Sequence, residues 1–385
     1  MTKKILISGA GIGGLALAHW LARYGHAVTV VEKAPAMRPG GQAVDFKGAA
    51  HLTVLERMGI LEDVRRHATG GADLYFVDAD GRRLGVMPGE FTGGDLEILR
   101  GDLARLLHDR VRDRADVVFG DSITSLAETP DGVRATFERA APGAYDLVVG
   151  ADGIHSNVRR LVFGPERDYV RHQGHYYALA GLDRDFGPDG LMYNEPGRLV
   201  SVGGNKAPAF FVFASPELEY DRYDPEAQIA ILTRAYAGMG WRTAEVVEAL
   251  QGTRDVYLDS ISRVHMEEYT RGRVALLGDA GYGNTLGGFG SGLALVGAYV
   301  LAGELAAAGG DHRAAFRRYQ EILLRYSKVA RKGNAGPFLA PPTWRRIRSR
   351  NRLFRYRPML KLMIAMGERF ATGIDLRDYP VPAHR

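Results

Sequence analysis

The feature that most constrains this chain is its first segment, residues 4–32, where a strand-like run is followed by three glycines and a helix-like run. The apolar run from Lys4 to Ser8 ends at Gly9, and the glycines recur at Gly11 and Gly14 with the spacing G-x-G-x-x-G. Apolar residues then recur at helical spacing, and a second apolar run ends on Glu32. This order predicts a βαβ unit that holds a dinucleotide.

Each residue type in this segment suits a phosphate-bearing ligand. Gly9 permits a tight turn, Gly11 lets the backbone approach a pyrophosphate, and Gly14 lets the helix pack closely on the strand. The N–H groups at the helix start favour negative charge. Glu32 lies where a carboxylate accepts the ribose hydroxyls. A glycine-rich turn can also be purely structural, but strand, helix and acid together favour the dinucleotide. The pattern does not decide between FAD and NAD.

Length and cysteine content bound the protein class. A chain of 385 residues suits two domains, or one domain with a large insertion. The absence of cysteine excludes disulfides, thiolate metal sites and iron–sulfur clusters, and we predict no metal site. The N-terminus shows no signal-peptide pattern and no run of 18 apolar residues occurs, so we expect a cytoplasmic protein.

The positive charge is local. The whole chain carries +5 and the segment from Trp344 to Lys361 carries +8 without an acid, so the remainder carries −3. We therefore expect no nucleic-acid partner. The favoured interpretation of this basic segment is a C-terminal helix that packs across both domains with solvated arginines, without membrane association. The alternative is interfacial binding to a membrane or an acidic partner.

Two further strand-like runs end on acidic residues. One run is followed by Asp152-Gly153, and another by Gly278-Asp279 and a glycine-rich stretch that opens an apolar helix over residues 293–308. The carboxyl ends of parallel strands meet at one sheet edge, where such folds bind ligands. Either aspartate alone is best read as an ordinary turn residue. Together with Glu32 they favour a cofactor site. A further helix is predicted over residues 98–112.

These motifs resemble those of the group A FAD-dependent aromatic monooxygenases, which have the para-hydroxybenzoate hydroxylase-like fold. Within that family the chain resembles tetracycline-inactivating enzymes and natural-product tailoring hydroxylases. The resemblance implies an α/β fold: a Rossmann-like FAD-binding domain, an inserted mixed β-sheet substrate domain and a C-terminal helix. The FAD-binding domain would comprise residues 1–70, 98–168 and 265–320. Residues 71–97 and 169–264 would form the substrate-binding domain, and 321–385 a C-terminal helical region bridging the two.

The resemblance also assigns cofactors and their residues. FAD would be the bound cofactor, NADPH or NADH the transient reductant, and O2 the oxidant. Glu32 would hold the adenosine ribose, Arg38 and Arg100 would lie near the adenine or pyrophosphate, and Asp279 would hold the ribityl chain. The implied cofactor-binding residues are Gly9, Gly11, Gly13, Gly14, Glu32, Lys33, Arg38, Gln42, Asp45, Arg100, Asp152, Gly278, Asp279, Gly288, Gly290, Ser291 and Gly292.

By the same resemblance, a flavin C4a-hydroperoxide would hydroxylate an aromatic or polyketide-like small molecule in a dry pocket. The predicted substrate residues are Tyr177, Asn194, Arg198, Phe211 and Phe213. Any one of these aromatics is equally well a residue of a second core. No catalytic residue is assigned with certainty, because the chemistry is flavin-mediated. His175 is the nearest candidate base, but a lone histidine is more often structural.

One departure from the family pattern leaves alternatives open. The third motif reads Gly278-Asp279-Ala280-Gly281-Tyr282, and the proline that usually precedes the glycines is missing. An FAD-dependent reductase or saturase of the same fold, or a non-catalytic drug-sequestering flavoprotein, therefore remain alternatives. Neither a biosynthetic nor an antibiotic-resistance role is preferred, and the protein could be a monomer or a homodimer.

Overall fold

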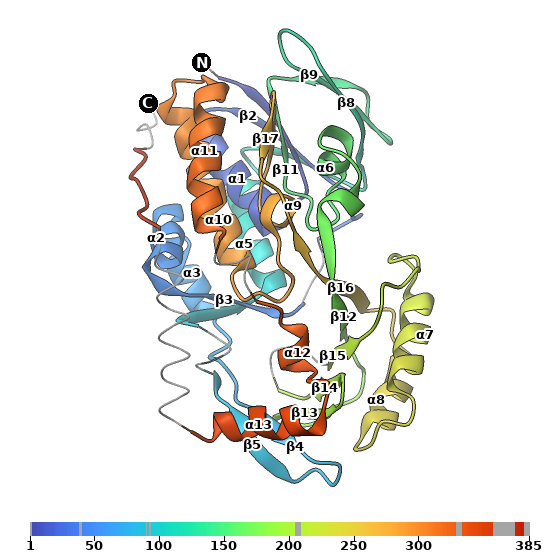
Figure 1. Cartoon of the computed structure of the whole chain (residues 1–385). Coiled ribbons are helices and arrows are strands. Elements are labelled where there is room, and N and C mark those ends of the chain that lie inside the picture. Colours follow the sequence, from blue (N-terminus) through green and yellow to red (C-terminus); the bar gives the residue numbers. More distant parts are fainter. Residues whose placement is uncertain are drawn as a thin grey trace.

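The computed structural model describes residues 2–37, 41–89, 91, 94–204, 209–328, 333–356 and 374–380. Two large sheets dominate these residues, one in the upper and one in the lower half of the view in Figure 1. The chain crosses between the halves several times, since each sheet contains strands from separate parts of the sequence. The predicted α/β class is confirmed.

The upper sheet has six strands and is almost entirely parallel. Its order is β17 (Thr270–Arg271), β18 (Val274–Leu276), β11 (Leu147–Gly150), β1 (Lys4–Ser8), β2 (Ala27–Glu32) and β7 (Asp116–Phe119), and only β17 runs antiparallel to its neighbour. After Lys4, every residue of β1 is buried, because helices cover both faces of a parallel sheet. The three acidic motifs follow β2, β11 and β18, so they share one sheet edge.

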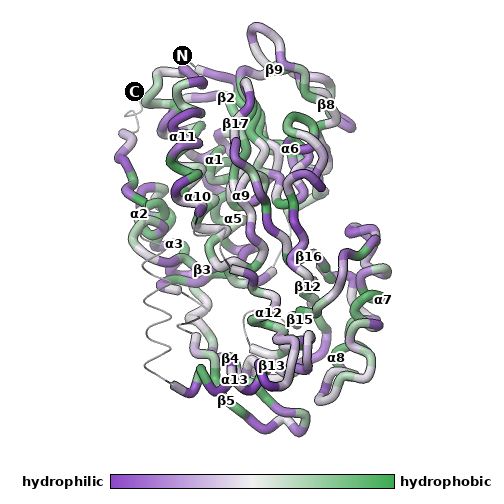
Figure 2. Tube along the Cα trace, viewed as in Figure 1, coloured by the Kyte–Doolittle hydropathy of each residue, from purple (hydrophilic) through white to green (hydrophobic). Residues whose placement is uncertain are grey.

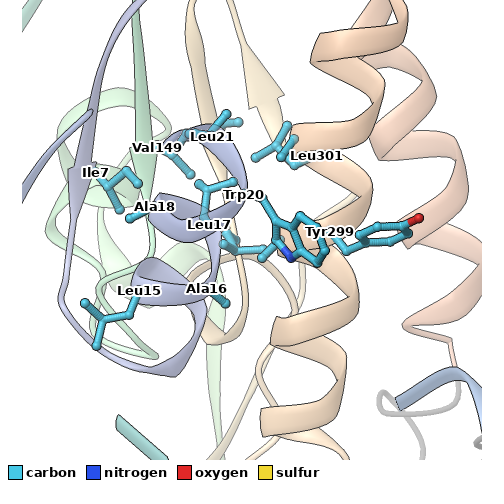
Figure 3. Close-up of a cluster of buried hydrophobic side chains, with 14 of the residues drawn as sticks. Ile7, Leu15, Ala16, Leu17, Ala18, Trp20, Leu21, Val149, Tyr299 and Leu301 are labelled. Atoms are coloured by element: carbon cyan, nitrogen blue, oxygen red, sulfur yellow. The ribbon is translucent and has the colours of Figure 1, made fainter. Parts of the chain in front are cut away.

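Helices surround this sheet. They are α1 (Ile12–Arg23), α2 (Gly48–Met58), α3 (Leu61–Arg66), α5 (Arg100–Val111), α6 (Asn157–Val162), α9 (Asp279–Tyr282), α10 (Gly290–Ala307) and α11 (His312–Tyr326). The apolar helix α10 packs against α1, where the rings of Trp20 and Tyr299 lie 5.0 Å apart (Figure 3). Among the described residues, α10 alone is long and apolar enough to span a membrane, but 78% of it is buried within the protein.

The lower sheet has seven strands and is mostly antiparallel. Its order is β16 (Val256–Val264), β12 (Val170–Ala180), β15 (Ala209–Ala214), β14 (Arg198–Val202), β13 (Gly190–Glu195), β4 (Leu74–Val77) and β5 (Arg83–Met87), with β13 and β4 parallel. Helices α7 (Pro225–Tyr236) and α8 (Thr243–Leu250) cover one face. Helices α12 (Gly336–Leu339) and α13 (Trp344–Phe354) cover part of the other.

Two small sheets and a short 3-10 helix complete the elements. They are β3 (Ala43–Phe46) with β6 (Leu96–Leu99), β8 (Ile123–Glu128) with β9 (Val133–Phe137) and β10 (Gly143–Tyr145), and η1 (Glu166–Asp168). The helix predicted over residues 98–112 starts later than expected, because Ile98 and Leu99 pair with β3 as a strand. Arg100 is therefore the first residue of α5.

The chain reaches both halves of the molecule near its C-terminus. Helix α13 packs on β5 and β13 of the lower sheet. Residues 374–380 instead lie against the upper half, where the Tyr379 hydroxyl donates a hydrogen bond of 2.6 Å to Glu304 of α10. The Tyr379 ring rests on Gly303, where an added Cβ would meet it at 2.3 Å.

Candidate active site

Glycines shape the turn after β1. Gly9 has a φ of +104°, and a Cβ there would lie 2.5 Å from the Ala151 carbonyl oxygen. A Cβ on Gly14 would lie only 1.9 Å from the Gly9 carbonyl oxygen. At Gly11, by contrast, the nearest atom is Nη2 of Arg100 at 3.8 Å. The backbone at Gly11 is therefore open to a ligand, as a pyrophosphate requires.

Glu32 is held beside this turn. One carboxylate oxygen accepts a hydrogen bond from the Ala10 N–H and the other from the Ala34 N–H, both at 2.8 Å. The side chain is half-buried, and each oxygen has a further lone pair. Its position at the end of β2 suits a ribose contact. The next residue, Lys33, is exposed and places its ammonium 4.3 Å from the ring centre of Tyr223. Arg38 lies outside the described residues.

Asp152 has an internal structural role. Its carboxylate accepts hydrogen bonds from the hydroxyls of Ser8 and Ser156 and from the Val158 N–H. Burial raises the pKa of Asp152, while these hydrogen bonds oppose the rise. The side chain therefore ties the end of β1 to the start of α6. Gly153 follows with φ +79° and no atom within 4 Å of an added Cβ, so the open part of this motif is its glycine.

Asp279 and Arg100 bring the first and third motifs together. Each is exposed and begins a helix, α9 for Asp279 and α5 for Arg100. Although part of Asp279 is accessible to solvent, the protein atoms around its carboxyl partly desolvate it and raise its pKa, and the positive charge of Arg100 opposes that rise. Arg100 forms no ion pair with any described residue, and its backbone N–H donates to the Gln42 carbonyl. A free cation beside Gly11 suits a pyrophosphate.

The start of α10 completes this edge of the sheet. An added Cβ on Gly290, the first residue of α10, would lie 3.6 Å from Oδ1 of Asp279. Gly288 is exposed and has no atom within 4 Å of an added Cβ, Ser291 is half-buried, and Gly292 is packed on the His51 imidazole. The first N–H groups of an 18-residue helix thus lie next to Asp279.

Three predicted cofactor residues lie around this edge in supporting positions. Gly13 and Gly278 pack on α10, where an added Cβ on either would lie 3.4 Å from the Ala294 methyl group. Asp45, on β3, forms a 2.8 Å ion pair with Lys47, and burial raises the pKa of its carboxyl.

The predicted substrate residues are divided between the two faces of the lower sheet. Phe211 and Phe213 lie on the face that α7 covers, and both rings contact Tyr236. Arg198 lies there too and donates to the backbone carbonyls of Ala235 and Ala237. The structure does not bring these three residues to the upper sheet. Side chains alternate along β15, with Phe211 and Phe213 on one face and Phe210 and Val212 on the other, but alternation alone could not show which face α7 covers.

The other two predicted substrate residues lie on the opposite face. Tyr177 is buried, and the charges of both Asp279 and Arg100 act on its hydroxyl. Asn194 donates to the Leu339 carbonyl and accepts a 2.7 Å hydrogen bond from Arg350 of α13. His175 is buried against Gly336, and burial lowers its pKa, which fits a structural histidine.

A chain of polar side chains lies behind Tyr177, and it was not predicted from the sequence. The Tyr257 hydroxyl hydrogen-bonds with Tyr177 and donates to Asp259 at 2.7 Å. Asp259 lies 3.0 Å from Nε2 of His155, and Nδ1 of His155 lies 2.9 Å from Glu166. The two carboxylates outweigh burial and raise the pKa of His155 to about 9. In the sequence, this chain of polar groups is indicated only by Asp259, a charged residue within the segment 256–264 that forms β16.

The loop that lacks the family proline carries a strained residue. Leu286 has a φ of +57°, a conformation that a residue with a side chain rarely adopts. Its side chain packs with the apolar cluster that includes Tyr177, Phe210 and Phe338. The loop after Asp279 therefore reaches the face of the lower sheet that bears Tyr177.

Comparisons with known proteins show the family of this chain. Residues 2–331 match the family described as FAD binding domain. An uncharacterised protein of Mycobacterium tuberculosis is 43% identical over 330 residues, which cover 82% of this chain and 88% of that protein. A flavin-dependent monooxygenase of Legionella longbeachae is 36% identical over 340 residues, which cover 86% and 87%. The crystal structure of tetracycline destructase Tet(51) superimposes with a TM-score of 0.84 at 31% identity, covering 99% of this chain and 100% of that one.

The family resemblance seen in the motifs is thereby confirmed. The matched residues include the glycine turn and all three acidic strand ends. The chain belongs to the FAD-binding domain family of flavin-dependent monooxygenases.

Proposed function

We propose that this protein uses NAD(P)H and O2 to hydroxylate an aromatic or polyketide-like small molecule where the two large sheets meet. The position of Tyr177 is the main support. It lies on the lower sheet, yet Leu286, on the loop that follows Asp279, packs in the same apolar cluster, and the charges of Asp279 and Arg100 both influence the pKa of the Tyr177 hydroxyl. Groups suited to a flavin and groups suited to a polar substrate therefore adjoin one another.

The residues at the upper sheet edge fit FAD. Gly11 leaves backbone space for the pyrophosphate, Arg100 offers a free cation, and Glu32 lies at the ribose position. Asp279 adjoins the start of α10, whose N–H groups favour negative charge on the ring system. When bound and reduced, the flavin supplies the activated oxygen.

The lower sheet would orient the substrate and exclude water. Tyr257 has one hydroxyl proton and donates it to Asp259, so its oxygen accepts from Tyr177. The oxygen of Tyr177 can then accept a hydrogen bond from a hydroxyl group of the substrate. Phe210, Leu286 and Phe338 belong to the apolar cluster beside it, and apolar surroundings protect a reactive oxygen species from water.

An oxygen-uptake assay tests this function. The purified protein would receive NADPH or NADH and a panel of phenolic polyketides that includes a tetracycline. We expect O2 consumption that depends on the substrate, with a product heavier by one oxygen atom. Silence across a broad panel with protein that retains its FAD would contradict the proposal.

Two other functions remain as alternatives, because the loop that carries Leu286 lacks the proline that is usual in the family. A reductase or saturase of this fold would oxidise NAD(P)H with its substrate without consuming O2. A drug-sequestering flavoprotein would bind the polyketide, change the flavin spectrum and turn over nothing. The same assay, with O2 and NAD(P)H followed together, separates the three functions. Because one similar protein of known structure is a tetracycline destructase, a tetracycline is the first substrate to test.

A further inference from the structure

Helix α13 presents a face of unpaired arginines to solvent. Arg345, Arg346, Arg348, Arg352 and Arg355 are all exposed, and none of them forms an ion pair with a described residue. The helix and its flanks contain no acid from Thr343 to Tyr356. Figure 2 shows this hydrophilic stretch at the end of the molecule opposite α11. The reaction proposed above makes no use of this face.

The arginine face is held in a fixed orientation. Arg350, on the opposite side of the helix, is buried and donates to the carbonyls of Phe338 and Leu339 at 2.9 and 3.0 Å and to Asn194 at 2.7 Å. Ile347 and Phe354 are buried with it. The helix therefore cannot turn its exposed arginines inward without breaking these contacts.

Aromatic side chains flank the arginines. Trp344, at the start of α13, is 49% exposed, and Tyr356, just after its end, is 67% exposed. Leu84, on the neighbouring strand β5, is 43% exposed. Among the described residues only Val118 and Tyr223 are comparable exposed hydrophobics, so three of five lie on this one end. Tryptophan and tyrosine favour the interface between water and lipid headgroups.

A hollow adjoins the same face. It has a volume of about 590 Å³, with Phe338 and Leu353 contributing apolar surface and Arg346, Arg352 and Tyr356 contributing polar groups. A phosphate bound by arginines above an apolar floor is the chemistry of a phospholipid headgroup and its first acyl carbons.

We infer that the α13 face, defined as the five exposed arginines with Trp344, Tyr356 and Leu84, docks the protein on a membrane surface rich in anionic phospholipid. The exposed aromatics favour a bilayer over a nucleic acid. The charge distribution favours it as well, because the chain outside residues 344–361 carries a net −3 and only this end would be attracted. The inference does not depend on the proposed reaction.

Vesicle sedimentation tests the inference with the full-length holoenzyme. We expect binding to vesicles of phosphatidylcholine mixed with phosphatidylglycerol at low salt, and none to pure phosphatidylcholine. Each arginine near an anionic surface multiplies the partition coefficient by about five. The double variant Arg345→Gln with Arg348→Gln should therefore lower the partition coefficient roughly 25-fold. Arg317→Gln with Arg325→Gln removes the same charge from α11 and should leave binding unchanged, since both residues are exposed at the far end.

Tryptophan fluorescence provides a second readout. Of the three tryptophans, Trp20 is buried and Trp241 is half-buried against Tyr193, whereas Trp344 is exposed. An emission blue shift on adding anionic vesicles should therefore disappear in Trp344→Phe and persist in Trp241→Phe. Absence of binding, or equal loss in the α11 control pair, would overturn the inference. Tighter binding to a duplex DNA oligonucleotide than to the vesicles would also overturn it, since a nucleic acid would then be the partner.

Discussion

The proposed binding sites on the two large sheets are built from different parts of the chain. At the edge of the parallel upper sheet, backbone geometry shapes the proposed cofactor site, since the turn of Gly9, Gly11 and Gly14 leaves space for a ligand. On the antiparallel lower sheet, the proposed substrate site depends on side chains, in a buried chain of hydroxyl, carboxylate and imidazole groups that begins at Tyr177. Substitutions should therefore act differently in the two regions.

The two sites should therefore tolerate substitutions to different degrees. In a site formed by backbone, one added carbon atom prevents folding at some positions and leaves the fold intact at neighbouring positions. A site made of side chains depends on each group's partner, so its losses are smaller and depend on pH. Substitutions in the glycine turn of the upper sheet and in the side-chain cluster of the lower sheet can therefore confirm or contradict this contrast.

The glycines of the first turn should separate folding from cofactor binding. Gly14→Ala places a Cβ 1.9 Å from a carbonyl oxygen, so we expect a cost of at least about 3 kcal/mol in the free energy of unfolding and loss of FAD. In Gly11→Ala the nearest protein atom is 3.8 Å away. We expect its stability to change by less than about 1 kcal/mol while its Kd for FAD rises at least about tenfold.

Thermal melting of the apoproteins and flavin absorbance of the purified proteins measure the two effects. The pair forms its own control, because both variants add one methyl group to the same turn. If Gly11→Ala were as unstable as Gly14→Ala, the open space at Gly11 would have no bearing on a ligand.

The two aspartates that follow strands β11 and β18 of the upper sheet should differ in the same way. Asp279→Asn keeps the shape but removes the charge beside Arg100 and the start of α10, so we expect the Kd for FAD to rise about 10- to 100-fold. Asp152→Asn should leave FAD affinity unchanged and cost about 1–2 kcal/mol of stability, because its three hydrogen bonds are internal. Flavin titration and melting would show the contrast, and equal FAD loss in both variants would contradict it.

The same contrast explains what the sequence could predict. The spacing of Gly9, Gly11 and Gly14 and the acids at strand ends reflect backbone requirements, which leave few residue choices. They therefore predicted the fold correctly, and they predict the sheet edge where the cofactor would bind. The role of Arg100 came from the family resemblance alone and stays a prediction, and the structure starts its helix later than predicted.

The lower sheet was harder to predict for a physical reason. Alternation along β15 separates Phe211 and Phe213 from Phe210 and Val212, but both sets face apolar cores, so the sequence cannot say which set faces α7. The chain from Tyr177 to Glu166 joins residues far apart in sequence. Each member alone looks like an ordinary strand or loop residue.

The ion triad of His155, Glu166 and Asp259 should make stability depend on pH. The folded pKa of His155 is about 9, above the ordinary value of about 6.5, so its contribution is complete below pH 6.5 and is lost as the pH rises toward 9. His155→Gln should cost about 2 kcal/mol at pH 6, because it leaves Asp259 without its cation.

Melting temperatures of the wild type and His155→Gln, measured from pH 6 to pH 9.5, test this expectation. The difference between the two proteins should narrow as the pH rises. A constant difference would mean that the imidazole acts by packing alone. Asp63→Asn is the control, since it removes exposed ion pairs with Arg66 and Arg110 that should contribute little.

The smallest effects should distinguish the two faces of the lower sheet. Phe211→Leu lies in the core against Tyr236, so we expect a loss of about 1 kcal/mol of stability and unchanged steady-state turnover. Tyr177→Phe removes one hydroxyl on the other face, beside Asp279 and Arg100, and should lower turnover about fivefold with FAD content retained. Substrate-dependent O2 uptake and thermal melting of both variants check the pair. If Phe211→Leu lowered turnover and Tyr177→Phe did not, the substrate would bind on the α7 face, and the side-chain site would have to be placed there instead.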